Sequence, residues 1–228
     1  MNPRLVLGKS INQRLDDIVG FDAFAAFSEE GVFTLCDGAN SCPNSGLAAQ
    51  WLCQKLASQS INVKGRTNLS ALVHRLHLEM QQCYPETAAT ALWVKAGLEG
   101  LELSSVGDSS LRVYQRKWAG WGPWFEICSM PRDIDAHGHP SQLIGSEVLN
   151  TVHHQFLSAR VPLIVLMMSD GPANVLSESR LLGVLRNLGR QSPSSYDLDY
   201  LCTNLVNQAF DLGCRDDASV AMIWVHLS

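Results

Sequence analysis

The sequence predicts an α+β fold: a four-layer αββα sandwich in which two antiparallel β-sheets stack face to face and are flanked by helix pairs. Three observations predict it. Short apolar runs bounded by turn residues alternate with pairs of amphipathic helices along the chain. An apolar fraction of 46% in 228 residues is ample for a large core. No linker, repeat or low-complexity tract divides the chain, so we expect a single domain over residues 1–228.

The first strands are expected in a hairpin. The polar stretch 8–14 is turn-prone and leads into residues 15–27, whose apolar residues favour one or two strands. The turn 28–31 then connects to an apolar run, 31–36. This run is rich in β-branched and aromatic residues, which is typical of a buried strand.

Two amphipathic helices follow this hairpin. Apolar residues recur at helical spacing between Leu47 and Leu56 and again between Leu69 and Met80, so each helix has one apolar face. Short apolar segments separated by Gly-containing turns then form a meander, whose sheet needs the cover that the helix pair can provide. The expected strands of the meander are 87–94, 101–106 and 111–115.

The second half of the chain begins with three tryptophans around Gly and Pro in the stretch 118–125. This stretch favours a decorated hairpin edge, with a stacking or carbohydrate-binding platform as the alternative. Further on, Ser194 and Asp197 have the spacing of a capping box at the start of a helix. The expected elements of this half are a loop at 129–141, strands at 155–157, 163–168 and 218–226, and helices beginning at Ser177 and after Ser194.

Acidic residues stand where three of these strands end or begin. Asp37 closes the run 31–36, Asp170 closes the run 163–168, and the pair Asp216 and Asp217 immediately precedes the last strand. A single Asp-Gly pair is most often only a turn, but acids at three strand ends can converge on one oxygen-rich site. The strand ends therefore predict a candidate metal site.

Carboxylates at such a site suit magnesium or manganese. Two such ions about 3.5–4 Å apart can share a bridging carboxylate, lower the pKa of a bound water and clamp a phosphoryl group. Asp37 fits the bridging position, and the carbonyl of Gly38 can serve as a further ligand. Asp16 and Asp17 are expected at a strand edge facing Asp37.

Composition excludes several other classes of protein. The net charge is −5 and the 17 basic residues are scattered, so the sequence lacks the clustered basic stripe expected of a nucleic-acid-binding surface. No stretch approaches the roughly 20 apolar residues of a membrane helix, and the amino terminus does not match a secretory signal. The seven cysteines lack the pair spacing of a zinc site and are expected to be mainly buried thiols. A cytoplasmic protein without nucleic-acid or membrane partners is expected.

The order of these segments resembles the metal-dependent protein phosphatase family, type 2C, over nearly the whole chain, and in particular its compact bacterial members. One motif would be weak evidence, whereas seven in the family order form a specific pattern. The motifs that carry the resemblance are Asp16-Asp17, Asp37-Gly38, Thr87-Ala88-Ala89-Thr90-Ala91, Val106-Gly107-Asp108-Ser109, the segment 139–145 as a short helix ending in Gly, Ser169-Asp170-Gly171 and Arg215-Asp216-Asp217-Ala218-Ser219-Val220.

The resemblance implies an enzyme that hydrolyses phosphoserine and phosphothreonine on proteins by attack of a metal-bridging water held by Asp37. It implies two Mn²⁺ or Mg²⁺ ions and a third, looser ion associated with Asp108. Asp16 would hold a metal-bound water. The implied partner is a phosphorylated protein, the target of a cognate serine/threonine kinase or the kinase itself. The implied metal ligands are Asp17, Asp37, the Gly38 carbonyl, Asp170 and Asp216.

Two departures from the family pattern leave a second function open. The family usually has an arginine five positions before the first ligand Asp to hold phosphate, and Asn12 stands there in this chain. Arg14 or Lys9 could substitute, and Arg14 is preferred because a guanidinium can bind phosphate bidentately. The loop 39–46 also lacks the paired glycines and the histidine found in many members. The alternatives are a catalytically weak or inactive phosphatase-like binding module, a different metallohydrolase and an unrelated binding domain.

Overall fold

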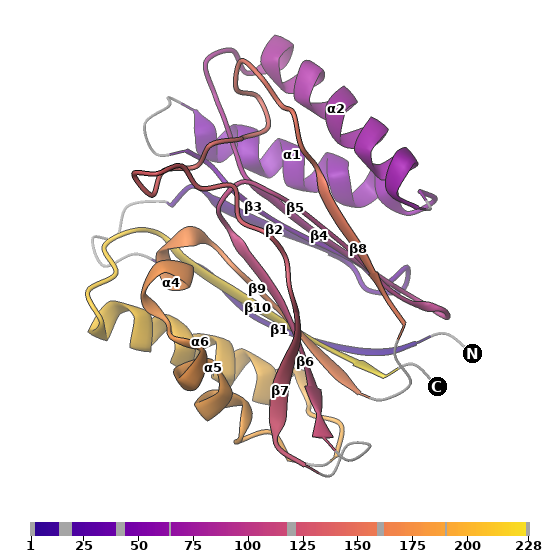
Figure 1. Cartoon of the computed structure of the whole chain (residues 1–228), viewed down its shortest axis with the longest axis vertical. Helices are drawn as coiled ribbons and strands as arrows, with labels where there is room; N and C mark the ends of the chain where they lie inside the picture. Colours follow the sequence, from indigo (N-terminus) through magenta and orange to yellow (C-terminus); the bar gives the residue numbers. More distant parts are fainter. Residues whose placement is uncertain are drawn as a thin grey trace.

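The computed structural model confirms the α+β four-layer sandwich (Figure 1). It describes residues 3–13, 20–39, 44–63, 65–117, 122–158, 162–189 and 191–226. Two five-stranded sheets stack on each other, and every pairing between neighbouring strands is antiparallel. The first sheet has the order β1 (Arg4–Gln13), β10 (Ala218–His226), β9 (Leu163–Met168), β6 (Ser110–Arg116), β7 (Trp124–Ser129). The second sheet has the order β2 (Asp22–Phe27), β3 (Val32–Asp37), β4 (Ala91–Gly97), β5 (Gly100–Val106), β8 (His153–Leu157).

Helices cover the outer face of each sheet (Figure 1). The second sheet is covered by α1 (Ser45–Ser60) and α2 (Arg66–Cys83). The first sheet is covered by α4 (Asp170–Val175), α5 (Glu178–Leu185) and α6 (Ser195–Asp211). None of the described helices is both long and apolar enough to cross a membrane.

The core has three layers because the central strands are buried on both faces. In β4, Leu92 and Val94 pack between the two sheets, whereas Trp93 points outward under α1 and α2. The indole nitrogen of Trp93 donates a hydrogen bond of 2.7 Å to the hydroxyl of Ser60, so its polar atom is satisfied inside the core. The same two-sided burial explains why these strands are nearly continuous apolar runs in the sequence.

The prediction of a turn-prone segment at 8–14 was wrong, because residues 8–13 belong to strand β1. Leu5, Leu7 and Ile11 pack against the core between the sheets, and β1 pairs with β10 from Arg4 opposite His226 onward. The side chains therefore alternate as a half-buried strand requires. Gly8 is needed in this strand since a Cβ there would lie 2.2 Å from the Cβ of Leu198 in α6.

The prediction of a short helix at 139–145 was also wrong, because this segment is extended. Ala89 and Ile144 exchange two backbone hydrogen bonds of 2.9 Å, and Ile134 forms a bridge with Pro140. These contacts use the backbone groups that helical hydrogen bonds would need. The connection between β7 and β8 is thereby tied to the loop that precedes β4.

Most other elements are confirmed within a few residues. The last strand has the expected bounds, Ala218–His226, and α6 begins with the expected capping box of Ser194 and Asp197. The sequence did not predict the short helix α4, and β4 begins at Ala91 rather than at residue 87. In the tryptophan-rich stretch, Trp124 is buried at the start of β7, which pairs with β6. Residues 118–121 lie outside the described residues, so the choice between a hairpin edge and a stacking platform stays open.

Candidate active site

Four of the predicted acids converge on one pocket at an end of the sandwich. Asp37 ends β3 of the second sheet, and Asp170 begins α4 just after β9 of the first sheet. Asp216 precedes β10, and Asp108 lies in the turn between β5 and β6, where the chain crosses from one sheet to the other. The pocket has a volume of about 270 Å³ and is lined by Asp37, Gly38, Ala39, Thr90, Asp108, Pro140, Leu143, Asp170 and Asp216.

Two glycines allow the backbone to pass close to its neighbours at this pocket. A Cβ on Gly38 would lie 2.6 Å from the carbonyl oxygen of Ser45, the first residue of α1. A Cβ on Gly171 would lie 2.3 Å from the carbonyl oxygen of Asp217. Both Asp-Gly pairs therefore need glycine for close packing, so they are more than ordinary surface turns.

A pair of hydroxyls links the strand ends that carry Asp37 and Asp108. The amide of Asp37 donates to the hydroxyl of Thr90 at 3.2 Å, and the amide of Thr90 donates to the carbonyl of Asp37 at 2.8 Å. The hydroxyls of Thr90 and Ser109 lie 2.7 Å apart. Asp108 is thus connected to the end of β3 through buried polar groups, which favours a fixed geometry.

Sequence reasoning missed Asp22, which is the acid directly opposite Asp37 in the β2–β3 hairpin. The Asp22 side chain is only 3% exposed, and the side chains of Asp37, Ser169 and Ser219 lie near enough to act on its charge. Burial, together with the nearby carboxyl of Asp217, raises its pKa to about 7 against the opposing effect of Ser219, Asp37 and Ser169. The signal that could have found Asp22 is the hairpin register, because counting residues outward from the turn 28–31 pairs it with Asp37.

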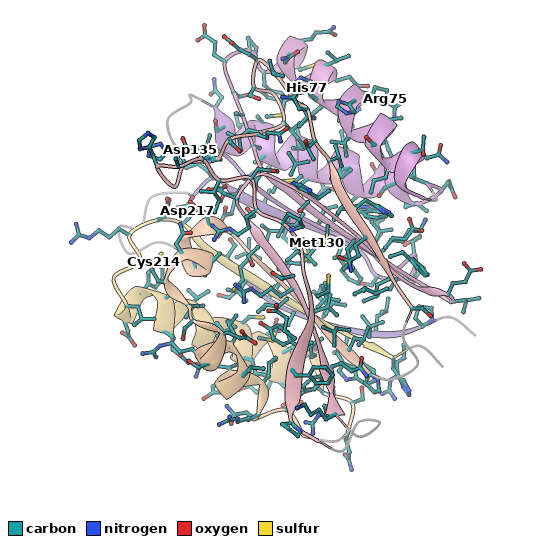
Figure 2. The ribbon with its side chains drawn as sticks, in the orientation of Figure 1. Arg75, His77, Met130, Asp135, Cys214 and Asp217 are labelled. Carbon is teal, nitrogen blue, oxygen red and sulfur yellow. The ribbon has the colours of Figure 1, made fainter. Side chains whose placement is uncertain are left out.

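Asp217 has a structural role beside the pocket. Its carboxylate accepts a hydrogen bond from the amide of Phe21, and its own amide donates to the carboxylate of Asp216 at 2.8 Å. The contact with Phe21 joins the start of β10 in the first sheet to the start of β2 in the second. Figure 2 shows Asp217 on the left side of the molecule, close to α4. Of the two consecutive acids, Asp216 therefore faces the pocket and Asp217 holds the two sheets together.

Three of the carboxyls at this pocket, those of Asp37, Asp108 and Asp170, hold their protons more tightly than usual because their pKa is raised. Burial raises the pKa of Asp37 well above its ordinary range, and the charges of Asp22 and Asp170 add to this shift. Burial and the charges of Asp108 and Asp216 raise the pKa of Asp170 to about 6. Burial also raises the pKa of Asp108. Several negative groups gathered around one pocket favour a cation as the ligand.

The donor set suits divalent ions that keep part of their water. The described residues offer carboxylate oxygens and the Gly38 carbonyl, which are the hard ligands that Mg²⁺ and Mn²⁺ prefer. Within the described part of the chain, no three acidic, histidine or cysteine side chains come close enough to bind one ion together. The arrangement fits ions that take one or two carboxylates each and complete their coordination with water.

Three other predicted site residues, Arg14, Asp16 and Asp17, lie outside the described residues. Asn12 lies in β1 without a described side chain. The residue paired directly with Asp37 in the β2–β3 hairpin is Asp22, and the expected place of Asp16 and Asp17 facing Asp37 stays a prediction.

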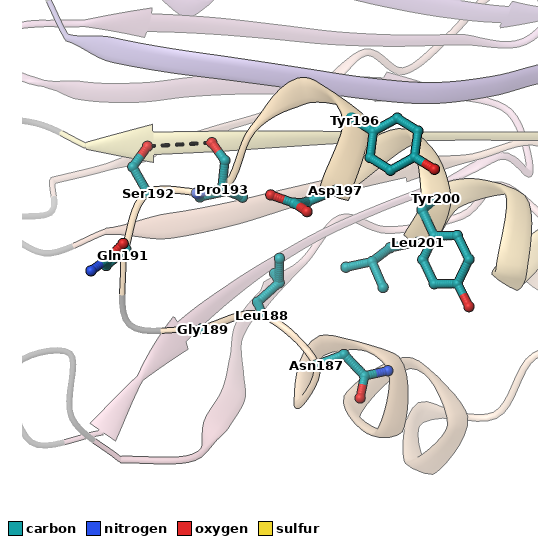
Figure 3. A pocket seen from close by; sticks show the side chains of 10 residues that line it. All are labelled: Asn187, Leu188, Gly189, Gln191, Ser192, Pro193, Tyr196, Asp197, Tyr200 and Leu201. Carbon is teal, nitrogen blue, oxygen red and sulfur yellow. Dashed lines mark hydrogen bonds between the residues drawn. The ribbon is translucent and has the colours of Figure 1, made fainter.

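A larger cavity on the far side of the first sheet has different chemistry. It has a volume of about 680 Å³ and lies between the end of α5 and the start of α6, with Tyr196 and Tyr200 at its rim (Figure 3). Asp197 is the one acid among its described lining residues, and its carboxylate is already engaged in the capping box with Ser194. The acid-lined pocket is therefore the better candidate for an active site, although it is smaller.

Comparison with known proteins identifies a family. The sequence matches the family model of protein phosphatase 2C over residues 12–197. Comparison with curated proteins gives no sequence match.

Solved structures share the fold at low identity. The serine/threonine phosphatase of S. agalactiae has 16% identity and a TM-score of 0.73, with 99% of this chain and 100% of that chain covered. PppA, described as a key regulatory component of T6SS in Pseudomonas aeruginosa, has 14% identity, a TM-score of 0.71 and coverage of 98% and 97%. The catalytic domain of the serine/threonine phosphatase PstP, in complex with two manganese ions, has 19% identity, a TM-score of 0.70 and coverage of 99% of each chain.

Proposed function

Because the chain belongs to the protein phosphatase 2C family, we propose that it is a metal-dependent phosphatase that hydrolyses phosphoserine and phosphothreonine on proteins. The observation that carries this proposal is the pocket shared by Asp37, Asp108, Asp170 and Asp216, which come from both sheets. Four neighbouring acids would repel a phosphate unless cations were bound between them. Metal binding is therefore proposed as a condition for substrate binding.

We propose Mn²⁺ or Mg²⁺ as the cofactor, held by Asp37, Asp170, Asp216 and the carbonyl of Gly38. When bound, two such ions would activate water and neutralise charge on the phosphoryl oxygens. Asp37, which ends a strand and is bonded through its backbone to Thr90, would keep its carboxylate in a fixed orientation. Asp22 would support Asp37 from the opposite strand and accept hydrogen bonds in the buried space behind the pocket.

The proposed partner is a phosphorylated protein, either the target of a serine/threonine kinase or the kinase itself. The pocket is compact, and the exposed Pro140 and the partly exposed Leu143 line it beside the acids, which suits a phosphorylated side chain presented by a larger substrate. A cytoplasmic location is proposed as well, since the six described cysteines are free thiols, as in reducing compartments.

Hydrolysis of p-nitrophenyl phosphate and of a phosphothreonine peptide, with and without Mn²⁺, tests the proposal. The wild-type protein should release phosphate only with the metal. Asp37→Asn should abolish this release, because it removes the charge at the centre of the acid cluster while keeping the shape of the side chain. Asp197→Asn, which alters an acid of the α6 capping box, is the matched control and should retain the activity.

If the wild-type protein shows no Mn²⁺-dependent turnover above Asp37→Asn, the chain is not a phosphatase under these conditions. The alternative function, a binding module that recognises a partner without turnover, would then be favoured. Binding of the phosphopeptide and of its unphosphorylated form to the inactive protein would distinguish that case from an unrelated domain.

A further inference from the structure

An arginine that sequence analysis did not single out lies beside the acid-lined pocket. Arg132 follows β7 in the connection to β8 and is half-buried. We infer that Arg132 binds the phosphate group of the substrate, in the role for which Arg14 was preferred from the sequence. This inference rests on the proposed phosphatase function and adds to it the residue that orients the substrate.

Two hydrogen bonds anchor the guanidinium between the elements that carry Asp108 and Asp170. Its Nε donates to the backbone carbonyl of Asp108. Its Nη2 donates to the side-chain oxygen of Asn174 in α4 at 2.7 Å. Asp108 lines the pocket, and Asn174 belongs to the helix that begins with Asp170, another lining residue. The guanidinium is thus held next to residues of the proposed metal site, although Arg132 is not itself among the pocket's described lining.

The backbone next to Arg132 is held as firmly as its side chain. Asp133 donates its amide to the carbonyl of Gly107 at 2.8 Å, and its carboxylate accepts from the amide of Gly107 at 3.0 Å. The other oxygen of that carboxylate lies 2.7 Å from Nε2 of His153 on β8. A guanidinium held this way loses little conformational entropy when it binds a ligand.

The positive charge of Arg132 is available for an anion. Among the described residues, Arg132 forms no ion pair with a carboxylate, although Asp108 and Asp170 are near enough to act on its charge. In the described part of the chain, its two anchoring hydrogen bonds use Nε and one Nη2 hydrogen, so both Nη1 hydrogens and the second Nη2 hydrogen are left for a ligand. A planar donor pair beside a cation-binding pocket suits a tetrahedral phosphate, which guanidinium groups bind bidentately.

Other described cations near the site are less suitable. Lys9, the second candidate from the sequence, lies over the ring of Phe24 at 5.3 Å and lines a different cavity, which Gln50 and Cys53 also border. Arg112 is paired with Glu126 at 3.2 Å. Arg215 adjoins Asp216 but is exposed, so its side chain has no comparable anchoring by burial.

Binding of inorganic phosphate to the Mn²⁺-loaded protein, measured by calorimetry, tests the inference without relying on turnover. Arg132→Ala should weaken phosphate binding by about tenfold to a hundredfold, the usual effect of losing a charge-assisted hydrogen-bond pair. Arg132→Lys should recover part of the affinity, because it restores the charge without the planar fork. Arg215→Ala is the matched control and should bind phosphate as the wild type does.

Kinetics and metal binding separate phosphate recognition from a merely structural role. In the active enzyme, Arg132→Ala should raise KM for a phosphothreonine peptide more than it lowers kcat. Its affinity for Mn²⁺ and its thermal unfolding should stay close to those of the wild type. If Arg132→Ala is poorly folded, Asn174→Ala, which removes one anchor of the guanidinium, should give a smaller loss of phosphate affinity in the same direction.

Several results would overturn the inference. They are unchanged phosphate affinity in Arg132→Ala, no phosphate binding by the Mn²⁺-loaded wild type, or an equal loss in Arg215→Ala. A wild-type protein that binds phosphate through Arg132 but shows no turnover would support the inference and contradict the proposed function, so the two failures are distinguishable.

Discussion

Binding of Mn²⁺ should release protons from the pocket, because several of its carboxyls hold protons near neutral pH. At about pH 6.5, Asp22 with a pKa of about 7 is mostly protonated, and Asp170 with a pKa of about 6 is about one quarter protonated. Burial shifts the pKa of Asp37 in the same upward direction. A bound dication favours the ionised form of each carboxyl around it. Loading the site should therefore release at least about one proton per protein molecule, from Asp22 and Asp170 together, and more if Asp37 also ionises.

Calorimetric titration with Mn²⁺ in two buffers of different ionisation enthalpy measures this release directly. Asp22→Asn should release about one proton fewer, because it removes one titrating group and one charge that raises the pKa of Asp37. Asp197→Asn, far from the pocket in the α6 capping box, should release as many protons as the wild type. A heat of binding that is the same in both buffers would refute the reasoning, since it would mean that the carboxyls are already ionised when the metal arrives.

Three further predictions concern stability. Without metal, the free energy of unfolding should fall as pH rises from about 4 to about 7, because Asp22 has a pKa of about 7 in the folded protein and near 3.8 in the unfolded chain. At roughly 1.4 kcal/mol per pKa unit, the loss is about 4 kcal/mol. Urea unfolding at several pH values should show a smaller dependence of this free energy on pH for Asp22→Asn than for the wild type. Gly171→Ala should lower the free energy of unfolding by about 1–3 kcal/mol, since its Cβ would lie 2.3 Å from the carbonyl oxygen of Asp217. The control Gly183→Ala in α5, whose Cβ would have no atom within 4 Å, should be neutral or stabilising. Equal effects of the two substitutions would contradict the close packing at Gly171. Ser194→Ala should cost about 1 kcal/mol by removing the hydroxyl that accepts from the Asp197 amide, and thermal unfolding beside a Ser195→Ala control would detect it.

The elements with strong local signals were predictable from sequence. The hairpin leading to Asp37 has a turn between two apolar segments, and α6 has a capping box before its apolar face. Strand β1 was missed because Lys9 and Ser10 make it polar and its pairing partner, β10, lies at the opposite end of the sequence. Pairing with a distant strand leaves little trace in local composition.

The candidate site was predictable where an acid adjoins a strand end. Asp37, Asp170 and Asp216 stand at such positions, and the pocket unites them. Asp22 stands at the start of a strand and was overlooked in favour of the acidic pair Asp16 and Asp17, which looks more distinctive in the sequence. Arg132 could not have been found from its neighbours in sequence, since its relation to the site depends on the carbonyl of Asp108 and on Asn174.

The position of the pocket across both sheets has a mechanical consequence. The amide of Asp170 reaches the carboxylate of Asp37 at 3.5 Å, and few other polar contacts described at this end span the two halves of the sandwich. A cation bound by carboxylates from both sheets would hold the two sheets together at the pocket. Its removal should therefore increase local unfolding near the pocket more than at the opposite ends of the strands. Hydrogen exchange of the amides near Asp37 and Asp170 should then accelerate on chelation, while the middle of β9 and β10 stays protected.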